Sequence, residues 1–121
     1  MSRHAHVFVG GISSLDEVAG VVGRRMGGEF RRGPDGDLLM MLPSVAVNLG
    51  PHDFEDGDLT YDDGRDIPLA TDFPAWFEVR DLDKDYDRQN RMALDIFEIA
   101  RSMGWRAVAA DDLQTMLAVQ E

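Results

Sequence analysis

Short stretches of alternating apolar and polar residues mark the predicted strands of this chain. In residues 76–82, Trp76, Glu78 and Arg80 point one way, and Phe77, Val79 and Asp81 point the other. Residues 4–10 alternate in a similar way and end at a Gly-Gly pair. Because successive side chains of a strand point to opposite faces of a sheet, this period of two indicates extended chain. Strands are predicted at residues 4–10, 29–32, 38–42, 45–49, 76–82 and 105–109.

A period of three to four residues predicts the helices. Between about residues 85 and 103 an apolar stripe recurs at helical spacing, and Gly104 ends it. An earlier helix begins after Ser14, which forms a capping box with Glu17, and stops at Gly27-Gly28. A last helix is predicted from Asp111 as its N-cap, with Gln114 three residues on. Its inward side chains would be Leu113, Met116 and Leu117.

These elements predict one domain over residues 1–121, in the order β-α-β-β-(β)-β-α-β-α. We expect an α+β fold: a mostly antiparallel sheet of four to six strands with two main helices packed on one face. The strand at 45–49 could also extend its predecessor past a bulge at Pro43-Ser44. Residues 50–74 show no sustained periodicity and form the longest predicted loop.

The amino-acid composition limits the classes of protein to which this chain can belong. The 121 residues are 44% hydrophobic and 29% charged, which is typical of a globular domain. The chain has no cysteine, which excludes disulfides, thiolate metal sites and cysteine nucleophiles. No apolar stretch approaches the roughly 20 residues of a membrane helix, and the first residues do not form a signal peptide. A cytoplasmic protein is therefore expected.

Charge is distributed unevenly along the chain. Residues 1–34 carry five Arg against three acids, whereas residues 35–121 carry 20 acids against seven bases, for a total of −11. Much of the excess lies in residues 52–66, where Arg65 is the only Arg or Lys. The acids there are Asp53, Glu55, Asp56, Asp58, Asp62, Asp63 and Asp66. Such a surface repels nucleic acid and anionic membranes and attracts a basic partner.

Metal and catalytic motifs are incomplete in the sequence. His4-x-His6 places two imidazoles on one face of a strand, but no third ligand is near in sequence. The Asp81-x-Asp83-x-Asp85-x-Asp87 run is spaced like the start of a calcium loop. Its sixth position, Tyr86, cannot make the sharp turn, and its twelfth, Met92, lacks the bidentate carboxylate. We therefore expect no catalytic residues, no cofactor and no metal site.

Several segments resemble a group of small actinobacterial proteins that are encoded beside polymorphic toxins and are taken to be immunity proteins. The resemblance covers most of the chain. It rests on the opening strand and on residues Ser14–Glu17, Val47–Phe54, Asp72–Arg80, Ala93–Phe97 and Asp111–Gln114. It implies binding and neutralisation of a cognate toxin rather than catalysis.

The leading hypothesis is an interaction protein of immunity or antitoxin type. It would bind a basic toxin that acts on nucleic acid or a nucleotide, using the seven acids of residues 52–66. Phe54 and Tyr61 are the predicted apolar anchors within that segment. The alternative is a divalent-metal or calcium-binding module, or a metal-dependent enzyme. It would use His52 with the loop carboxylates, or Asp81–Asp87. A homodimeric structural module is a third hypothesis, and the sequence leaves the oligomeric state open.

Overall fold

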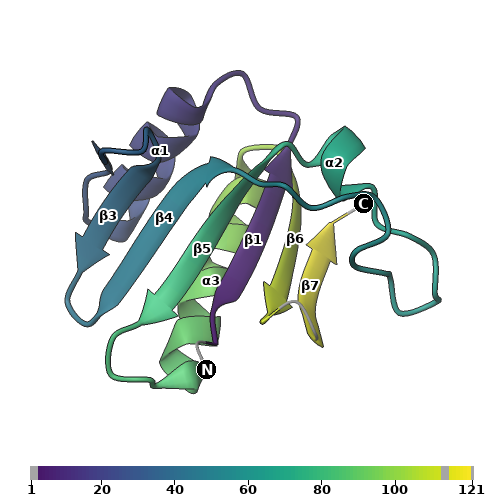
Figure 1. Cartoon of the computed structure of the whole chain (residues 1–121). Helices are drawn as coiled ribbons and strands as arrows, with labels where there is room; N and C mark the ends of the chain where they lie inside the picture. The colour runs from purple at the N-terminus through teal and green to yellow at the C-terminus, as the bar shows by residue number, and fades with distance from the viewer. Residues whose placement is uncertain (1–2, 113–114, 121) are drawn as a thin grey trace.

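The computed structural model describes residues 3–112 and 115–120, and over these it is an α+β fold as predicted (Figure 1). It contains a seven-stranded sheet and three helices. The elements are β1 (Ala5–Gly10), α1 (Leu15–Met26), β2 (Arg31–Arg32), β3 (Leu38–Leu42), β4 (Val45–Pro51), α2 (Leu69–Asp72), β5 (Ala75–Asp81), α3 (Tyr86–Ser102), β6 (Arg106–Asp111) and β7 (Thr115–Gln120).

The sheet is antiparallel throughout, with strand order β2-β3-β4-β5-β1-β6-β7. The first strand of the chain therefore lies in the interior of the sheet, between β5 and β6. Its register places His6 opposite Glu78 of β5 and opposite Ala110 of β6. Pairing on both sides fixes the backbone of residues that would otherwise fray at a chain end.

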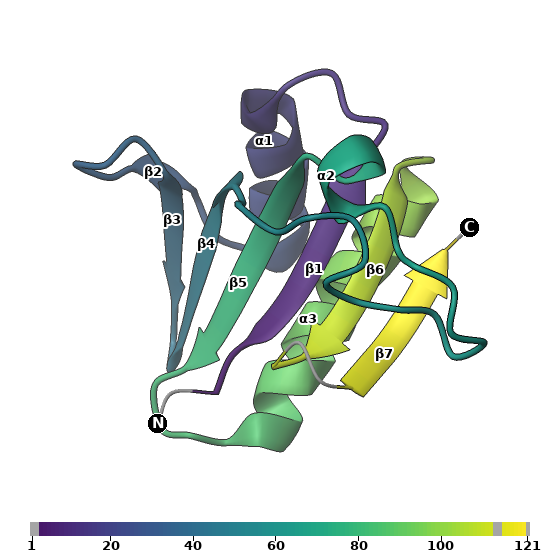
Figure 2. The same cartoon turned by 45° about the vertical axis from the view of Figure 1, so that its right-hand side comes forward.

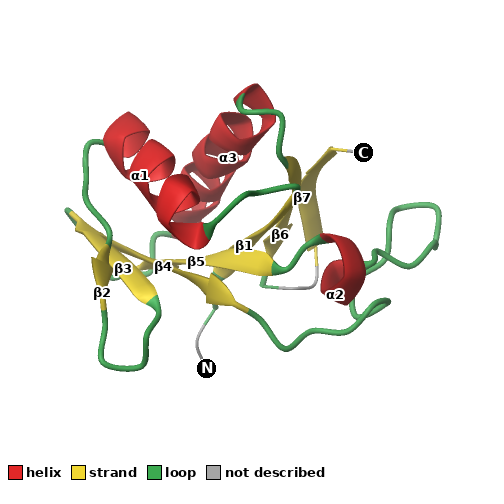
Figure 3. Cartoon of the chain, turned by 90° about the horizontal axis from the view of Figure 1, so that it is seen from above, coloured by secondary structure: helices red, strands yellow, loops and turns green. Residues whose placement is uncertain are grey.

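Helices α1 and α3 cover one face of the sheet (Figure 3). The side chain of Ser14 accepts a hydrogen bond from the Glu17 N–H at 3.1 Å, and α1 ends at Gly27 with a φ of 77°. The Ser14 N-cap and the glycine stop are thus where the sequence predicted them. The buried residues of α1 and α3 pack on the inward positions of the central strands, including Val7, Phe77 and Val79, to form the main core.

A second, smaller apolar cluster lies on the opposite face, under the segment that joins β4 to β5 (Figure 2). Four residues of that segment are buried: Leu59, Ile67, Leu69 and Phe73. They pack on Phe8, Val108 and Ala110 of the sheet. The predicted loop at 50–74 is therefore built into the fold, with the short helix α2 and a bridge between Thr60 and Asp66.

Two features of the predicted element order were wrong. The sheet has seven strands rather than four to six, and the predicted last helix is absent, because β6 continues through Asp111 and residues 115–120 form β7. Met116 packs on the second cluster and Leu117 on the main core, so neighbouring side chains face opposite sides as in a strand. A short apolar run fits both the helical and the strand period, so the sequence pattern alone led to the wrong prediction here. Leu113 and Gln114 lie outside the described residues.

Candidate functional site

The first candidate site is the acidic loop, residues 52–66. All seven of its predicted partner-binding carboxylates are exposed: Asp53, Glu55, Asp56, Asp58, Asp62, Asp63 and Asp66. Leu59, between them in sequence, is buried in the second cluster. The segment is thus held against the sheet by its apolar residues while its charges face outward.

Phe54 and Tyr61, the predicted anchors, contribute to the support of this loop. Both are half-buried and pack against the second cluster. The Phe54 ring meets Phe8 and Trp76 edge to face, with centroids 5.8 and 5.2 Å apart. The Arg65 guanidinium lies 4.7 Å from the centroid of the Tyr61 ring. A partner could therefore touch only the outer part of either ring.

The carboxylates of the loop divide into two groups. Asp56 accepts hydrogen bonds from the N–H groups of Ala70 and Thr71, at 2.8 and 3.0 Å, and from the Thr71 hydroxyl at 2.6 Å. That hydroxyl is the main cause of a lowered pKa for Asp56. Asp58 accepts from the Glu55 N–H, and Asp63 pairs with Arg65.

The second group faces solvent. The side chains of Asp53, Glu55 and Asp62 make no hydrogen bond with another described residue, and neither does the carboxylate of Asp66. The Asp56 carboxylate therefore helps to hold the backbone of the loop in place. The carboxylates of Asp53, Glu55 and Asp62 add negative charge but hold no backbone group.

His52 is part of the fold rather than a free ligand of the loop. Its Nδ1 accepts a hydrogen bond from the Phe54 N–H at 3.1 Å, so Nε2 carries the proton and donates it to the Phe73 carbonyl at 2.5 Å. Both ring nitrogens are occupied. Within the described ranges, no cluster of metal-ligating side chains includes His52 or the loop carboxylates.

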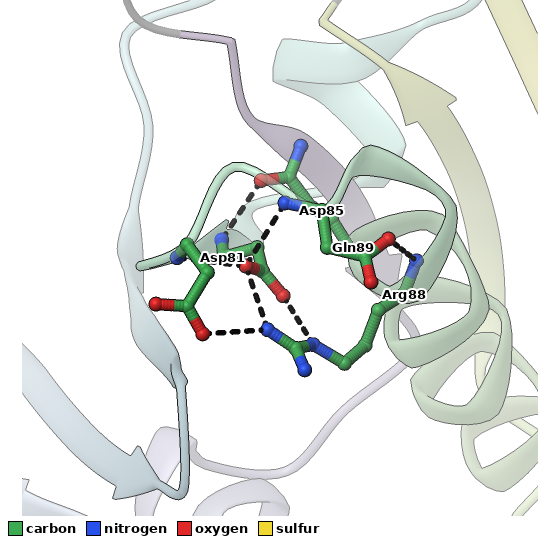
Figure 4. Close-up of polar contacts among 5 residues, drawn as sticks. Asp81, Asp85, Arg88 and Gln89 are labelled. Carbon is green, nitrogen blue, oxygen red and sulfur yellow. Dashed lines mark hydrogen bonds and ion pairs between the residues drawn. The ribbon is translucent and has the colours of Figure 1, made fainter.

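The aspartates that follow β5 connect that strand to α3 (Figure 4). Asp81 has a fully buried side chain and accepts hydrogen bonds from the N–H groups of Asp83 and Asp85. Arg88 donates to it from Nε at 2.5 Å and from Nη2 at 3.0 Å, which is the main cause lowering the pKa of Asp81 to about 2. Asp85 caps α3. A guanidinium therefore occupies the position that a bound cation would need.

A third group of side chains meets across β1 and β5. His6 lies on the face of β1 away from the helices, His4 directly precedes that strand, and Glu78 lies opposite His6 on β5. Glu78 Oε2 is 3.1 Å from His4 Nδ1 and 3.6 Å from His6 Nε2. The interaction with the nearby His6 ring is the main cause lowering the pKa of Glu78 to about 2.

The sequence contained part of the signal for this group. The alternation of residues 76–82 places Glu78 on one face of its strand, and His4-x-His6 supplies two imidazoles on one face of theirs. What the sequence does not carry is the pairing of β1 with β5, because these strands are distant along the chain. The sequence pattern therefore did not predict that Glu78 lies beside the two histidines.

The other half of the outer face, over β2–β4, is not covered by the acidic loop (Figures 1 and 2). Leu39 and Met41 of β3 are exposed there, Met41 by 58%. Arg31 and Arg32 of β2 line the same shallow hollow. The Arg pair and the acidic loop therefore lie toward opposite ends of the sheet.

Comparison of the chain with protein-family models, with curated proteins and with solved structures finds no match. None of the helices in residues 3–112 and 115–120 has the length and apolar character needed to cross a bilayer.

Proposed function

We propose that this chain is an interaction protein of immunity type that binds a basic toxin and occludes its active-site cleft. The observation that carries the proposal is the build of the acidic loop. Its apolar residues pack against the sheet in the second cluster, while its seven carboxylates are exposed. Like charges held close together repel one another and cost stability. A loop that fixes them in one place is suited to a positively charged surface.

The negative charge of the acidic loop favours a partner whose active-site cleft binds phosphate groups. A cleft that binds nucleic acid or a nucleotide is lined with Lys and Arg, and the acidic loop offers carboxylates in place of the phosphates. Complementary charge raises the association rate by roughly 10- to 1,000-fold at low salt. Asp53, Glu55 and Asp62 are the carboxylates best placed to contact the partner, because the fold makes no use of them.

The test is to isolate the basic protein that the chain retains from a lysate of its source organism at low salt. The association rate of the purified pair is then measured by stopped-flow fluorescence across a range of salt. We expect the rate to fall steeply with salt, and the Asp53→Lys/Asp62→Lys variant to slow association at least about tenfold. The affinity should persist in high salt through contacts that charge does not provide.

The matched control is Asp95→Lys/Glu98→Lys, which makes the same change in net charge on the exposed side of α3. It should alter the rate far less. If the two variants slow association equally, the net charge of the molecule would explain the effect, and the position of the charges in the acidic loop would not. Failure to retain any basic protein would contradict the proposal.

A further inference from the structure

His4, His6 and Glu78 form the one group of metal-ligating side chains that the described part of the chain brings together. Each residue offers one donor atom: His4 Nδ1, His6 Nε2 and a carboxylate oxygen of Glu78. All three atoms lie within 4.8 Å of one another. The sequence supplied the histidines, and the antiparallel register of β1 and β5 supplies the carboxylate.

The two distances between the Glu78 carboxylate and the imidazole nitrogens are close to those in the first coordination sphere of a small transition-metal ion. Zn²⁺ binds imidazole nitrogen and carboxylate oxygen at about 2.0–2.2 Å, so ligands at tetrahedral corners lie roughly 3.3 Å apart. The Glu78 oxygen is 3.1 and 3.6 Å from the two nitrogens. Binding would therefore require only small side-chain movements.

Packing fixes the rings before any ion arrives. His6 is buried and stacks on Trp76, with ring centroids 4.6 Å apart and planes only 5° from parallel. β1 is paired on both sides, so the backbone of His6 cannot move away. Two of the three ligands are thus held by strands, and the His4 backbone is tied by its carbonyl, which accepts a hydrogen bond from the Asp112 N–H at 2.7 Å.

Two ring nitrogens of this cluster lack hydrogen-bond partners in the described part of the chain. His4 Nε2 and His6 Nδ1 are buried and have no hydrogen-bond partner among the described residues. Buried polar atoms without partners are rare and costly. Both are the ring nitrogens opposite the proposed donor atoms, so they leave those donor atoms free to face Glu78 but would not themselves touch the ion.

Charges of both signs surround the three side chains. Arg3 is paired with Asp111, and Asp112 accepts a hydrogen bond from the His4 N–H at 3.4 Å. Arg80 lies next along the same face of β5, is exposed to solvent, and lines a hollow together with His4 and Lys84. The three ligands themselves, rather than a surplus of negative charge around them, would therefore have to hold the ion.

We propose that His4 Nδ1, His6 Nε2 and the Glu78 carboxylate bind a divalent transition-metal ion, with Zn²⁺ as the best match to two imidazoles and one carboxylate. Three protein ligands leave a fourth position for water or another donor, as in an open zinc site. This site is separate from the acidic loop and does not depend on the function proposed above.

The test is titration of the untagged protein with Co²⁺, which acts as a visible probe, followed by displacement with Zn²⁺. We expect one ion per chain and a visible absorption band of low-symmetry Co²⁺ that Zn²⁺ removes. Zn²⁺ at about 100 times its Kd should raise the Tm by on the order of 10 °C.

Two variants and one control identify the ligands. Glu78→Gln keeps the shape of its side chain, and His4→Gln changes a partly exposed one, so both should fold. Each should weaken Zn²⁺ binding at least about tenfold in calorimetry. His52→Gln removes the remaining histidine of the chain and should leave the Co²⁺ band intact.

Three outcomes would overturn the proposal. One is the absence of saturable binding at one ion per chain. Another is a Co²⁺ band that survives both Glu78→Gln and His4→Gln. The third is a band lost only in His52→Gln. Any of these would make the cluster a set of histidine–carboxylate hydrogen bonds and nothing more.

Discussion

Asp81 shows how much a single carboxylate can organise. It is buried at the end of β5 and accepts hydrogen bonds from two backbone N–H groups and from Arg88 (Figure 4). Gln89 secures the same residue from α3, by accepting a hydrogen bond from the Asp81 N–H at 2.9 Å. The aspartate spacing that suggested a calcium loop is thus used to join a strand to a helix.

Replacing Asp81 by Asn should lower the free energy of unfolding by about 2 kcal/mol at pH 7, because charged hydrogen bonds from Arg88 are lost. The folded pKa of Asp81, about 2, is below its ordinary value of 3.8. The stabilisation is therefore present above about pH 4 and is lost as pH falls toward 2. Urea unfolding between pH 7 and pH 2 should show the difference between the two proteins shrinking.

Asp83→Asn is the control for this prediction. Asp83 also contacts Arg88, at 3.1 Å, but it is exposed to solvent. Exposed ion pairs contribute little, so its loss should cost under about 1 kcal/mol. Equal losses for the two variants at pH 7 would refute the role assigned to the buried carboxylate.

At the scale of elements, β1 and α2 approach each other so closely that only glycine fits between them. A Cβ added to Gly10 would lie 1.8 Å from the Asp72 carbonyl oxygen, which belongs to the last residue of α2. The sequence marked Gly10 only as the end of a strand. The contact that requires glycine is made by a segment more than sixty positions later.

Gly10→Ala should therefore lower the Tm through a backbone displacement that costs roughly 1–3 kcal/mol or more. Gly20→Ala is the matched comparison, because its Cβ meets only the tip of the Arg24 side chain at 3.3 Å. Alanine favours a helix over glycine by up to about 1 kcal/mol, so this variant should hold or raise the Tm. Thermal melts followed by circular dichroism measure both, and a Gly10→Ala melt at the wild-type temperature would show that α2 moves freely.

At the scale of the whole molecule, the sheet has a core on each face. The two helices build the larger one, and the segment between β4 and β5 builds the smaller one. Phe8 and Val108 join the smaller cluster from strands whose other side chains, such as Val7 and Ala107, belong to the larger core. We expect the two cores to unfold together, because the same strands support both.

Leu69→Ala tests this coupling. Leu69 is fully buried in the smaller cluster, and buried Leu-to-Ala changes cost about 2–5 kcal/mol. We expect a single unfolding transition shifted by about that amount in urea. Leu39→Ala, at an exposed position of β3, should cost under about 1 kcal/mol. An unchanged midpoint combined with faster proteolysis of the acidic loop would mean that this segment unfolds independently.

Local signals in the sequence determined the elements whose rules act over a few residues. Ser14 with Glu17 and Gly27 set the limits of α1, the apolar stripe set α3, and alternation gave the two faces of β5. The exposure of the seven acids also followed from sequence, since unpaired carboxylates are rarely buried. These properties depend on hydrogen bonds and side-chain spacing within one turn or one pleat.

Tertiary structure alone decided what depends on neighbours distant along the chain. Residues 115–120 became a strand because β6 offered an edge and both faces offered apolar contacts. Glu78 met His6 because β1 inserted beside β5. The acidic loop gained a fixed shape because Ile67 and Phe73 found an apolar surface on the sheet. Strand order is set by the sum of many long-range contacts, and no short window of sequence contains that sum.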